Sequence, residues 1–414
     1  MEDIVHLQMK NKNVTFGLMI FYIIYTLKAW FFLYPYDVNW RYIIGPLLLF
    51  LVIFDKQMFR IDKKTLLFVI LALYAACYSG EKFNFNLILG NFFMLSGVFS
   101  VICLRKQYWP EFIKIFERIL IPITIISAIG WILFLLKIPL PYKYYTWEPV
   151  EGSYYEFYNY FVFLYCHQPD VVFPRFSSIF FEPGYYACFI VFLITYHHFN
   201  YKKKEVWIYS IALVLSFSLA GFFMYLIALI GFTLLKNKYG ILYIVFIIEG
   251  VNLFQVFFET YNKGDNIINN LILTRTVIED GAIAGYNRTG EAFDEEFIEF
   301  VKRGGNDFWW GASKSKQKAI NVANVGWKVY MYRYGFICFA IYIICIFVAY
   351  WPYKKERNAA IYVILFIMFF GRGHYEAWFA GFWMVYLSGM ANEERERTLT
   401  FKNKENGNTK FQIK

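Results

Sequence analysis

Arginines between the apolar runs are the residues of this 414-residue chain best suited to chemistry. A guanidinium group is planar and carries its donors in a fixed fork, so it binds two oxygens of a diphosphate at once. An arginine at depth in a membrane protein is costly and is usually kept for function. The charge pattern places five on the side away from the cytosol: Arg175, Arg275, Arg288, Arg303 and Arg372. Pairing with a carboxylate or extending to the interface is the alternative for each, and Arg303 is typical of an exposed helix end.

The most distinctive segment runs from Arg175 through Phe180-Phe181-Glu182-Pro183-Gly184. Pro183 predicts the first turn of a helix, which places Glu182 near the N-cap. Three roles are open to Glu182: a general base for a hydroxyl, a group that orients Arg175 or binds substrate, and a purely structural residue. The helix dipole and Arg175 would stabilise its ionised form, which weakens it as a base.

His374 is the second candidate base, because imidazole titrates near neutral pH. A helix-end histidine that hydrogen-bonds to backbone is the alternative. The six cysteines show no CxxC or Cys/His metal spacing, so the sequence predicts no zinc site and no disulfide framework. No nucleotide-binding or hydrolase motif stands in a suitable context, so we expect any energy to come from an activated lipid substrate on the outer side.

The composition indicates a membrane protein. Hydrophobic residues make up 59% of the chain, charged residues only 17%, and the mean hydropathy is +0.41. A soluble domain carries roughly 25% charged residues. The net charge of +10 lies in short clusters between apolar runs. That distribution is typical of membrane topology and argues against nucleic-acid binding.

Short loops rich in lysine and arginine stay in the cytoplasm, so the basic clusters orient the chain. If every basic cluster is cytoplasmic, the chain between two clusters must cross the membrane outward and then back, which takes two apolar runs. The exception is Val206–Leu235, which we therefore divide into two short helices that turn at 216–221. The prediction is then an all-α polytopic membrane protein with about twelve transmembrane helices and both termini cytoplasmic.

The predicted organisation has five parts. They are a cytoplasmic N-terminus (1–14), transmembrane helices (15–258) with an outer loop at 139–177, a large periplasmic loop (259–328), further transmembrane helices (329–390) and a cytoplasmic tail (391–414). Within the large loop, apolar spacing predicts amphipathic helices near Asn266–Asp280 and Glu291–Val301.

Two helical hairpins, around 216–221 and 371–374, have short arms. A helix of fifteen residues rises about 22 Å, against a hydrocarbon core of about 30 Å. Their tips should therefore lie below the membrane surface, and backbone survives there only inside protein or beside a wet cavity. Both tips point outward, so the sequence predicts a cavity that opens away from the cytosol.

Four short motifs resemble the O-antigen polymerase (Wzy-type) and O-antigen ligase group of membrane glycosyltransferases. They are Arg175 with Phe180–Gly184; the turn with Ser216, Ser218 and Gly221; Asn287-Arg288 before a helix and Phe308-Trp309-Trp310-Gly311; and Asn324-Val-Gly-Trp327 leading into Tyr330-Met-Tyr-Arg-Tyr-Gly335. The family often has an arginine in the second motif, where this chain has Leu219 and Ala220. Ligases typically carry a histidine near the fourth, where Asn324 stands, which favours polymerase over ligase.

The resemblance implies polymerisation of undecaprenyl-pyrophosphate-linked oligosaccharide repeats on the periplasmic face of the bacterial inner membrane. The product would be O-antigen, capsule or exopolysaccharide. Glu182, His374 and Arg288 would be catalytic, and five residues would bind pyrophosphate or glycan: Arg175, Arg275, Arg372, Asn324 and Trp327. The implied partners are the lipid-linked substrate, membrane lipid and a chain-length regulator, with no metal and no cofactor.

Outer aromatic residues fit this implication, because sugars stack on aromatic faces. The candidates are Trp147, Tyr154, Tyr155, Trp309 and Trp310. The interfacial belt of membrane proteins is the alternative for all five. Two rival functions also remain: a flippase for lipid-linked oligosaccharides, which needs polar groups across the whole membrane, and a membrane acyltransferase, for which His197 and His198 are the only hint.

Overall fold

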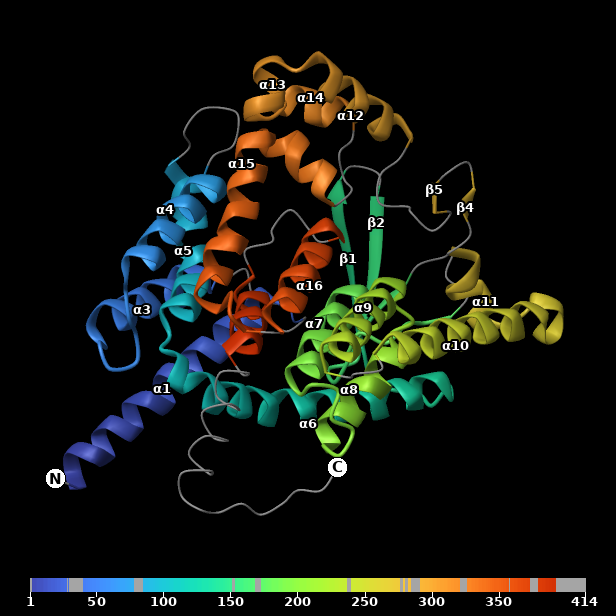
Figure 1. The fold of residues 1–414 in the computed structure, drawn as a ribbon, viewed down its shortest axis with the longest axis horizontal. Helices are drawn as coiled ribbons and strands as arrows, with labels where there is room; N and C mark the ends of the chain where they lie inside the picture. The colour runs from blue at the N-terminus through green and yellow to red at the C-terminus, as the bar shows by residue number, and fades with distance from the viewer. Residues whose placement is uncertain are drawn as a thin grey trace.

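In the computed structural model, the described residues are 2–27, 29, 40–77, 85–150, 153–167, 173–236, 240–275, 278–279, 282–283, 291–320, 326–356, 358–372 and 379–391. Over these residues the chain is nearly all α-helical (Figure 1), which confirms the coarse fold class. The first helices are α1 (Glu2–Thr26), α3 (Arg41–Phe54), α4 (Lys63–Cys77) and α5 (Phe85–Cys103). Helix α1 begins well before the predicted Thr15, so the expected N-terminal segment is largely helical.

The centre of the fold is α7 (Pro183–Tyr196), whose residues are all buried. Around it lie α6 (Trp109–Leu135), α8 (Lys204–Leu215) and α9 (Leu219–Lys236). The predicted division of Val206–Leu235 is confirmed, because α8 ends at Leu215 and α9 begins at Leu219. Phe217 holds a positive φ of 45° in the turn, and the Ser216 hydroxyl donates to the Leu213 carbonyl at 2.6 Å.

A buried polar network joins α6, α7 and α8 at one end of this central group. The Nε2 atom of His197 lies 2.7 Å from Oε1 of Glu117, and the Tyr209 hydroxyl donates to the same oxygen at 3.2 Å. Lys203 lies 3.3 Å from Nδ1 of His197. Because the ammonium group of Lys203 only donates, Nδ1 of His197 accepts that hydrogen bond. Nε2 then carries the ring proton and donates a hydrogen bond to the Glu117 carboxylate. His197 therefore has a buried carboxylate partner.

Three helical stretches are long and apolar enough to cross a membrane: Lys106–Leu135, Gly240–Gly264 and Trp327–Tyr353. They contain α6 after η1 (Lys106–Tyr108), α10 (Gly240–Thr260) with η2 (Tyr261–Gly264), and α15 (Trp327–Tyr350) with η4 (Trp351–Tyr353). Shorter apolar helices accompany them, including α16 (Ala359–Arg372) and a last helix, Ala380–Ala391. The membrane character is thus supported, whereas the count of about twelve spans and their orientation stay predictions.

The segment between α6 and α7 departs from the all-helical prediction. It forms an antiparallel sheet of three strands in the order β1 (Lys143–Val150), β2 (Ser153–Asn159) and β3 (Leu164–His167). Tyr145 pairs with Phe157, and Phe157 pairs with Cys166. Aromatic side chains suit a pleated surface that is half covered, and cross-strand aromatic pairs stabilise it.

The described residues between α10 and α15 form short elements. The predicted helix at Asn266–Asp280 is wrong in length, because α11 (Ile267–Leu271) and η3 (Leu273–Arg275) are followed by two short strands, β4 (Ile278–Glu279) and β5 (Ala282–Ile283). The helix predicted at Glu291–Val301 is confirmed as α12 (Glu291–Arg303). With α13 (Gly305–Trp310) and α14 (Lys314–Ala319) it makes a layer over one end of α15, which we call the cap (Figure 1).

The cap is attached to α15 at a break in that helix. Gly335 has φ 82° and ψ 166°, so the helix bends there (Figure 1). A break leaves carbonyl groups without helical partners, and the Ala312 nitrogen donates to the Tyr332 carbonyl at 2.8 Å. Gly311, with φ 96°, lies against the same turn. The two glycines allow the backbones of the cap and of α15 to touch.

Candidate functional site

The start of α7 and the end of α16 meet at the same end of the fold. The Tyr185 ring packs 5.7 Å from Phe369 and 5.2 Å from Phe379, measured between centroids. Tyr185 follows Glu182 by one helical turn, and Phe369 precedes Arg372 by the same interval. Two candidate segments that are far apart in sequence are therefore neighbours in space.

The start of α15 joins them. Tyr330 packs 5.5 Å from Phe370, centroid to centroid. At Gly326, an added Cβ would lie 3.5 Å from the Gly371 carbonyl oxygen. Trp327 directly follows Gly326, so the first, fourth and C-terminal candidate segments converge on one region. We call this region the convergence site.

The chain between Arg175 and Glu182 is fixed by backbone hydrogen bonds. The Phe176 nitrogen donates to the Leu215 carbonyl of α8 at 3.1 Å, and the Leu164 nitrogen of β3 donates to the Ser178 carbonyl at 2.9 Å. The Ser178 hydroxyl donates to that of Ser127 at 3.0 Å. Arg175 therefore belongs to a segment that hydrogen bonds hold between the sheet and the central helices.

Glu182 is the N-cap residue of α7, as predicted, with extended backbone angles of φ −132° and ψ 128°. Its carboxylate makes no capping hydrogen bond to the helix. The base, orienting and structural roles all remain open, and the half-buried carboxylate is placed at the edge of the convergence site.

The thiol of Cys166, on β3, lies near both Arg175 and Glu182. Burial raises the pKa of Cys166 to about 12, the positive charge of Arg175 lowers that pKa, and the negative charge of Glu182 raises it. One side chain on the sheet therefore senses both charged groups. The arginine and the glutamate of the first motif thus lie within electrostatic range of a common point.

We expect alkylation of Cys166 to report this arrangement. Only the thiolate reacts, so the rate should rise about tenfold per pH unit below pH 12. At fixed pH, Arg175→Ala should slow the reaction and Glu182→Gln should speed it, because the first raises the thiol pKa and the second lowers it. Maleimide labelling of purified protein that carries Cys77→Ser measures the rates, since Cys103, Cys188, Cys338 and Cys345 are buried. Equal rates in both variants would place the two charges away from Cys166.

Arg333 is a residue that the sequence reasoning missed. It lies half-buried in the first turns of α15, two residues before the bend at Gly335, and its carbonyl touches Gly311. The signal was present, because the motif around Gly335 contains an arginine inside an apolar run. The apolar run from Val329 onward predicts an ordinary membrane helix, and that pattern does not single out the arginine within it.

Several predicted site residues cannot be placed. Arg288, Asn324 and His374 lie outside the described residues. Arg275 ends η3 and Arg372 ends α16, but only their backbones are described. The same holds for Trp147, Tyr154 and Tyr155 on the sheet. The position of the Arg372 backbone supports its membership of the convergence site, and the other assignments stay predictions.

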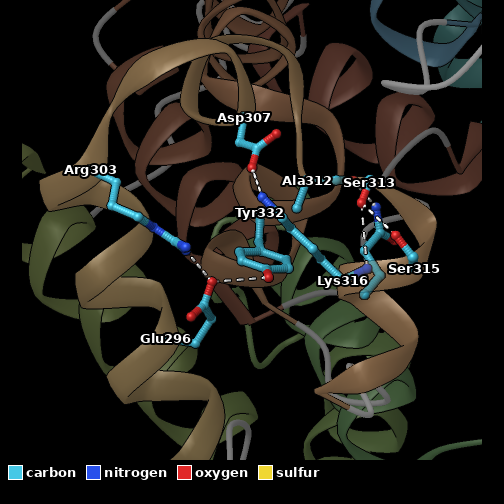
Figure 2. Close-up of polar contacts among 9 residues, drawn as sticks. Glu296, Arg303, Asp307, Ala312, Ser313, Ser315, Lys316 and Tyr332 are labelled. Carbon is cyan, nitrogen blue, oxygen red and sulfur yellow. Dashed lines mark hydrogen bonds and ion pairs between the residues drawn. The ribbon is translucent and has the colours of Figure 1, made fainter.

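Trp327 and Arg303 both contact residues of the cap. The Trp327 ring packs 5.6 Å from Phe297 of α12, and the side chain is 37% exposed. Arg303 pairs with Glu296, which also accepts a hydrogen bond from the Tyr332 hydroxyl at 3.3 Å (Figure 2). Arg303 is thus an exposed helix-end arginine with a carboxylate partner, as the alternative interpretation predicted.

A second ion pair, between Lys316 and Asp307, ties α14 to α13 (Figure 2). Lys328 at the start of α15 adds a third, to Asp294 at 2.6 Å. Trp309 and Trp310 lie in α13 and remain 45% and 38% exposed. The cap is therefore held on α15 by the Lys328–Asp294 pair and by an apolar cluster that joins Phe293, Phe297 and Phe300 to Val329, Met331 and Tyr332. It presents two indole rings to the exterior.

Among the described residues, no group of three or more histidine, cysteine, aspartate or glutamate side chains is arranged to hold a metal ion. Comparisons of the chain with protein-family models, with curated proteins and with solved structures found no match. The class of protein is therefore defined by its fold alone: a helical protein of membrane character with a small sheet and a helical cap.

Proposed function

We propose that the protein is an oligosaccharide polymerase that joins polyprenyl-pyrophosphate-linked repeat units at the outer face of the bacterial inner membrane. One observation carries the proposal: the segments that hold Glu182, Arg372 and Trp327 lie together although they are far apart in sequence. Arg175 is held near Glu182 by the sheet and α8. A carboxylate beside arginines suits transfer from a diphosphate.

In the proposed reaction, a hydroxyl oxygen of the incoming repeat forms a bond to the anomeric carbon of the growing chain. The bond from that carbon to the diphosphate oxygen breaks, and its electron pair leaves with the diphosphate. The hydroxyl proton passes to a base, for which Glu182 and His374 are the candidates. No nucleotide is needed, because the donor already carries its leaving group.

Arginines supply the electrostatic part of this proposal. Negative charge grows on the departing diphosphate, and fixed guanidinium groups stabilise it without reorganisation. Arg175 and Arg372 are the candidates by position, and Arg333 joins them as a half-buried arginine on α15. Arg288 keeps the role that the family resemblance implies.

The exposed indole rings of the cap are suited to binding the glycan part of the substrate. Indole faces are large and apolar with a polar edge, so they bind the faces of sugar rings. Trp309 and Trp310 present such surfaces near the bend in α15. The cap is held to α15 at Gly311, which places these rings beside the same helix that begins at the convergence site.

Deletion of the gene tests the proposal against its rivals. We expect single lipid-linked repeats to accumulate on the outer leaflet, because export continues while joining stops. Leaflet-specific enzymatic labelling and gel analysis of the glycan measure this. Accumulation on the cytoplasmic leaflet would indicate a flippase instead, and long chains that remain on the lipid carrier would indicate a ligase.

A further inference from the structure

Helix α10 is the least covered long helix among the described residues. No residue in the hydropathic window of Gly240–Gly264 is buried inside the molecule, and its mean hydropathy is 2.1. Figure 1 shows α10 running outward from α9, away from the rest of the fold. Ile241, Phe246 and Leu253 are 76%, 67% and 70% exposed. Lipid can cover such apolar side chains.

A stripe of polar residues interrupts this apolar surface. Glu249, Asn252, Gln255 and Glu259 follow at intervals of three or four residues, so they lie on one side of the helix. All four are exposed. Gln255 donates to Glu259 at 2.8 Å, whereas no described residue hydrogen-bonds to the side chain of Glu249 or Asn252. We call these four residues the polar stripe.

Lipid is a poor cover for the polar stripe. Glu249 lies near the midpoint of α10, where a carboxylate in hydrocarbon is expensive and normally marks a contact with another polar group. In membranes, asparagine and glutamine side chains associate helices by hydrogen bonds across the interface. The exposed position of Glu249 and Asn252 therefore calls for a partner from outside this copy of the chain.

We propose that α10 docks against α10 of a second copy of this chain through the polar stripe. The stripe is self-complementary, because a carboxamide donates hydrogen bonds and a carboxylate accepts them. Copies inserted the same way round bring the two helices together in parallel, with equal residues at equal depth. A two-fold axis then sets Asn252 of each copy beside Glu249 of the other, and both bonds form twice.

Cysteine cross-linking of adjacent positions tests this interface. Val256 and Phe257 are 58% and 56% exposed and lie at nearly the same depth. Val256 follows Glu249 by two helical turns and so shares the side of the polar stripe, whereas Phe257 points about 100° away. We expect Val256→Cys to give a disulfide-linked dimer in membranes under mild oxidation, and Phe257→Cys to give several-fold less. Equal cross-linking at both positions would overturn the proposal.

A second measurement uses the full chain in detergent and in nanodiscs. Light scattering should give twice the monomer mass for the wild-type protein and the monomer mass for Glu249→Leu/Asn252→Leu. The double variant removes polar groups from lipid, so it should fold at least as well. Phe246→Leu/Phe257→Leu is the matched control and should stay dimeric. A monomeric wild type, a dimeric double variant, or a complex that requires another membrane protein would overturn self-association.

Discussion

Replacement of Arg175 by alanine is expected to lower polymer synthesis by about a hundredfold or more, the usual effect of removing one preorganised charge from a transition state. The fork of donors matters as well as the charge, so Arg175→Lys should retain only part of the activity. Glycan gels from a deletion strain that carries each variant measure the chain lengths. Single lipid-linked repeats should accumulate as long chains disappear.

Arg303→Ala is the matched control for this experiment. Arg303 is another of the arginines predicted on the outer side, but it is 52% exposed at the end of α12 and pairs with Glu296. Exposed pairs contribute about 0–1 kcal/mol to stability, so chain lengths should stay normal. Wild-type chain lengths in Arg175→Ala, with the protein present at normal levels in the membrane, would contradict the assignment of Arg175 to the diphosphate.

Charge parity and helical spacing were sufficient to predict the helices that matter most. The turn between α8 and α9 followed from the basic residues on both sides of Val206–Leu235, and α12 followed from the repeat of Phe293, Phe297 and Phe300. The sheet was not predicted, because outer tyrosines fit a glycan path or an interfacial belt as readily as a strand. Their density between Lys143 and Asn159 is itself a strand signal.

The site was predictable residue by residue but not as an assembly. The proline after Glu182 marks a helix start in any context, so the position of that carboxylate could be predicted. The neighbourhood of Tyr185 and Phe369 depends on how α7 and α16 pack, which no local pattern encodes. The same limit explains Arg333, because its place at a bend depends on contact between Gly335 and the distant Gly311.

Replacement of Gly335 by alanine is expected to detach the cap from α15. An added Cβ would clash with the Trp309 carbonyl oxygen and lie 2.6 Å from the Gly311 nitrogen, and both of these are backbone atoms that cannot rotate away. The positive φ of 82° adds about 1–3 kcal/mol of strain for a residue with a side chain. We expect a lower thermal midpoint in detergent and rapid proteolysis within 291–320. Polymer synthesis should fall as well, because the cap no longer lies beside the start of α15.

Gly250→Ala is the control, since a Cβ there would meet nothing within 4 Å and alanine favours the helix α10. Its thermal midpoint should equal or slightly exceed that of the wild type, and its proteolysis should be unchanged. Gly311→Ala should reproduce the effect of Gly335→Ala, because its Cβ would lie 2.8 Å from the Arg333 carbonyl carbon. A Gly335→Ala protein whose cap resists protease as well as the wild type would show that the two backbones are not in contact, and the cap would then lose its role in holding the glycan near α15.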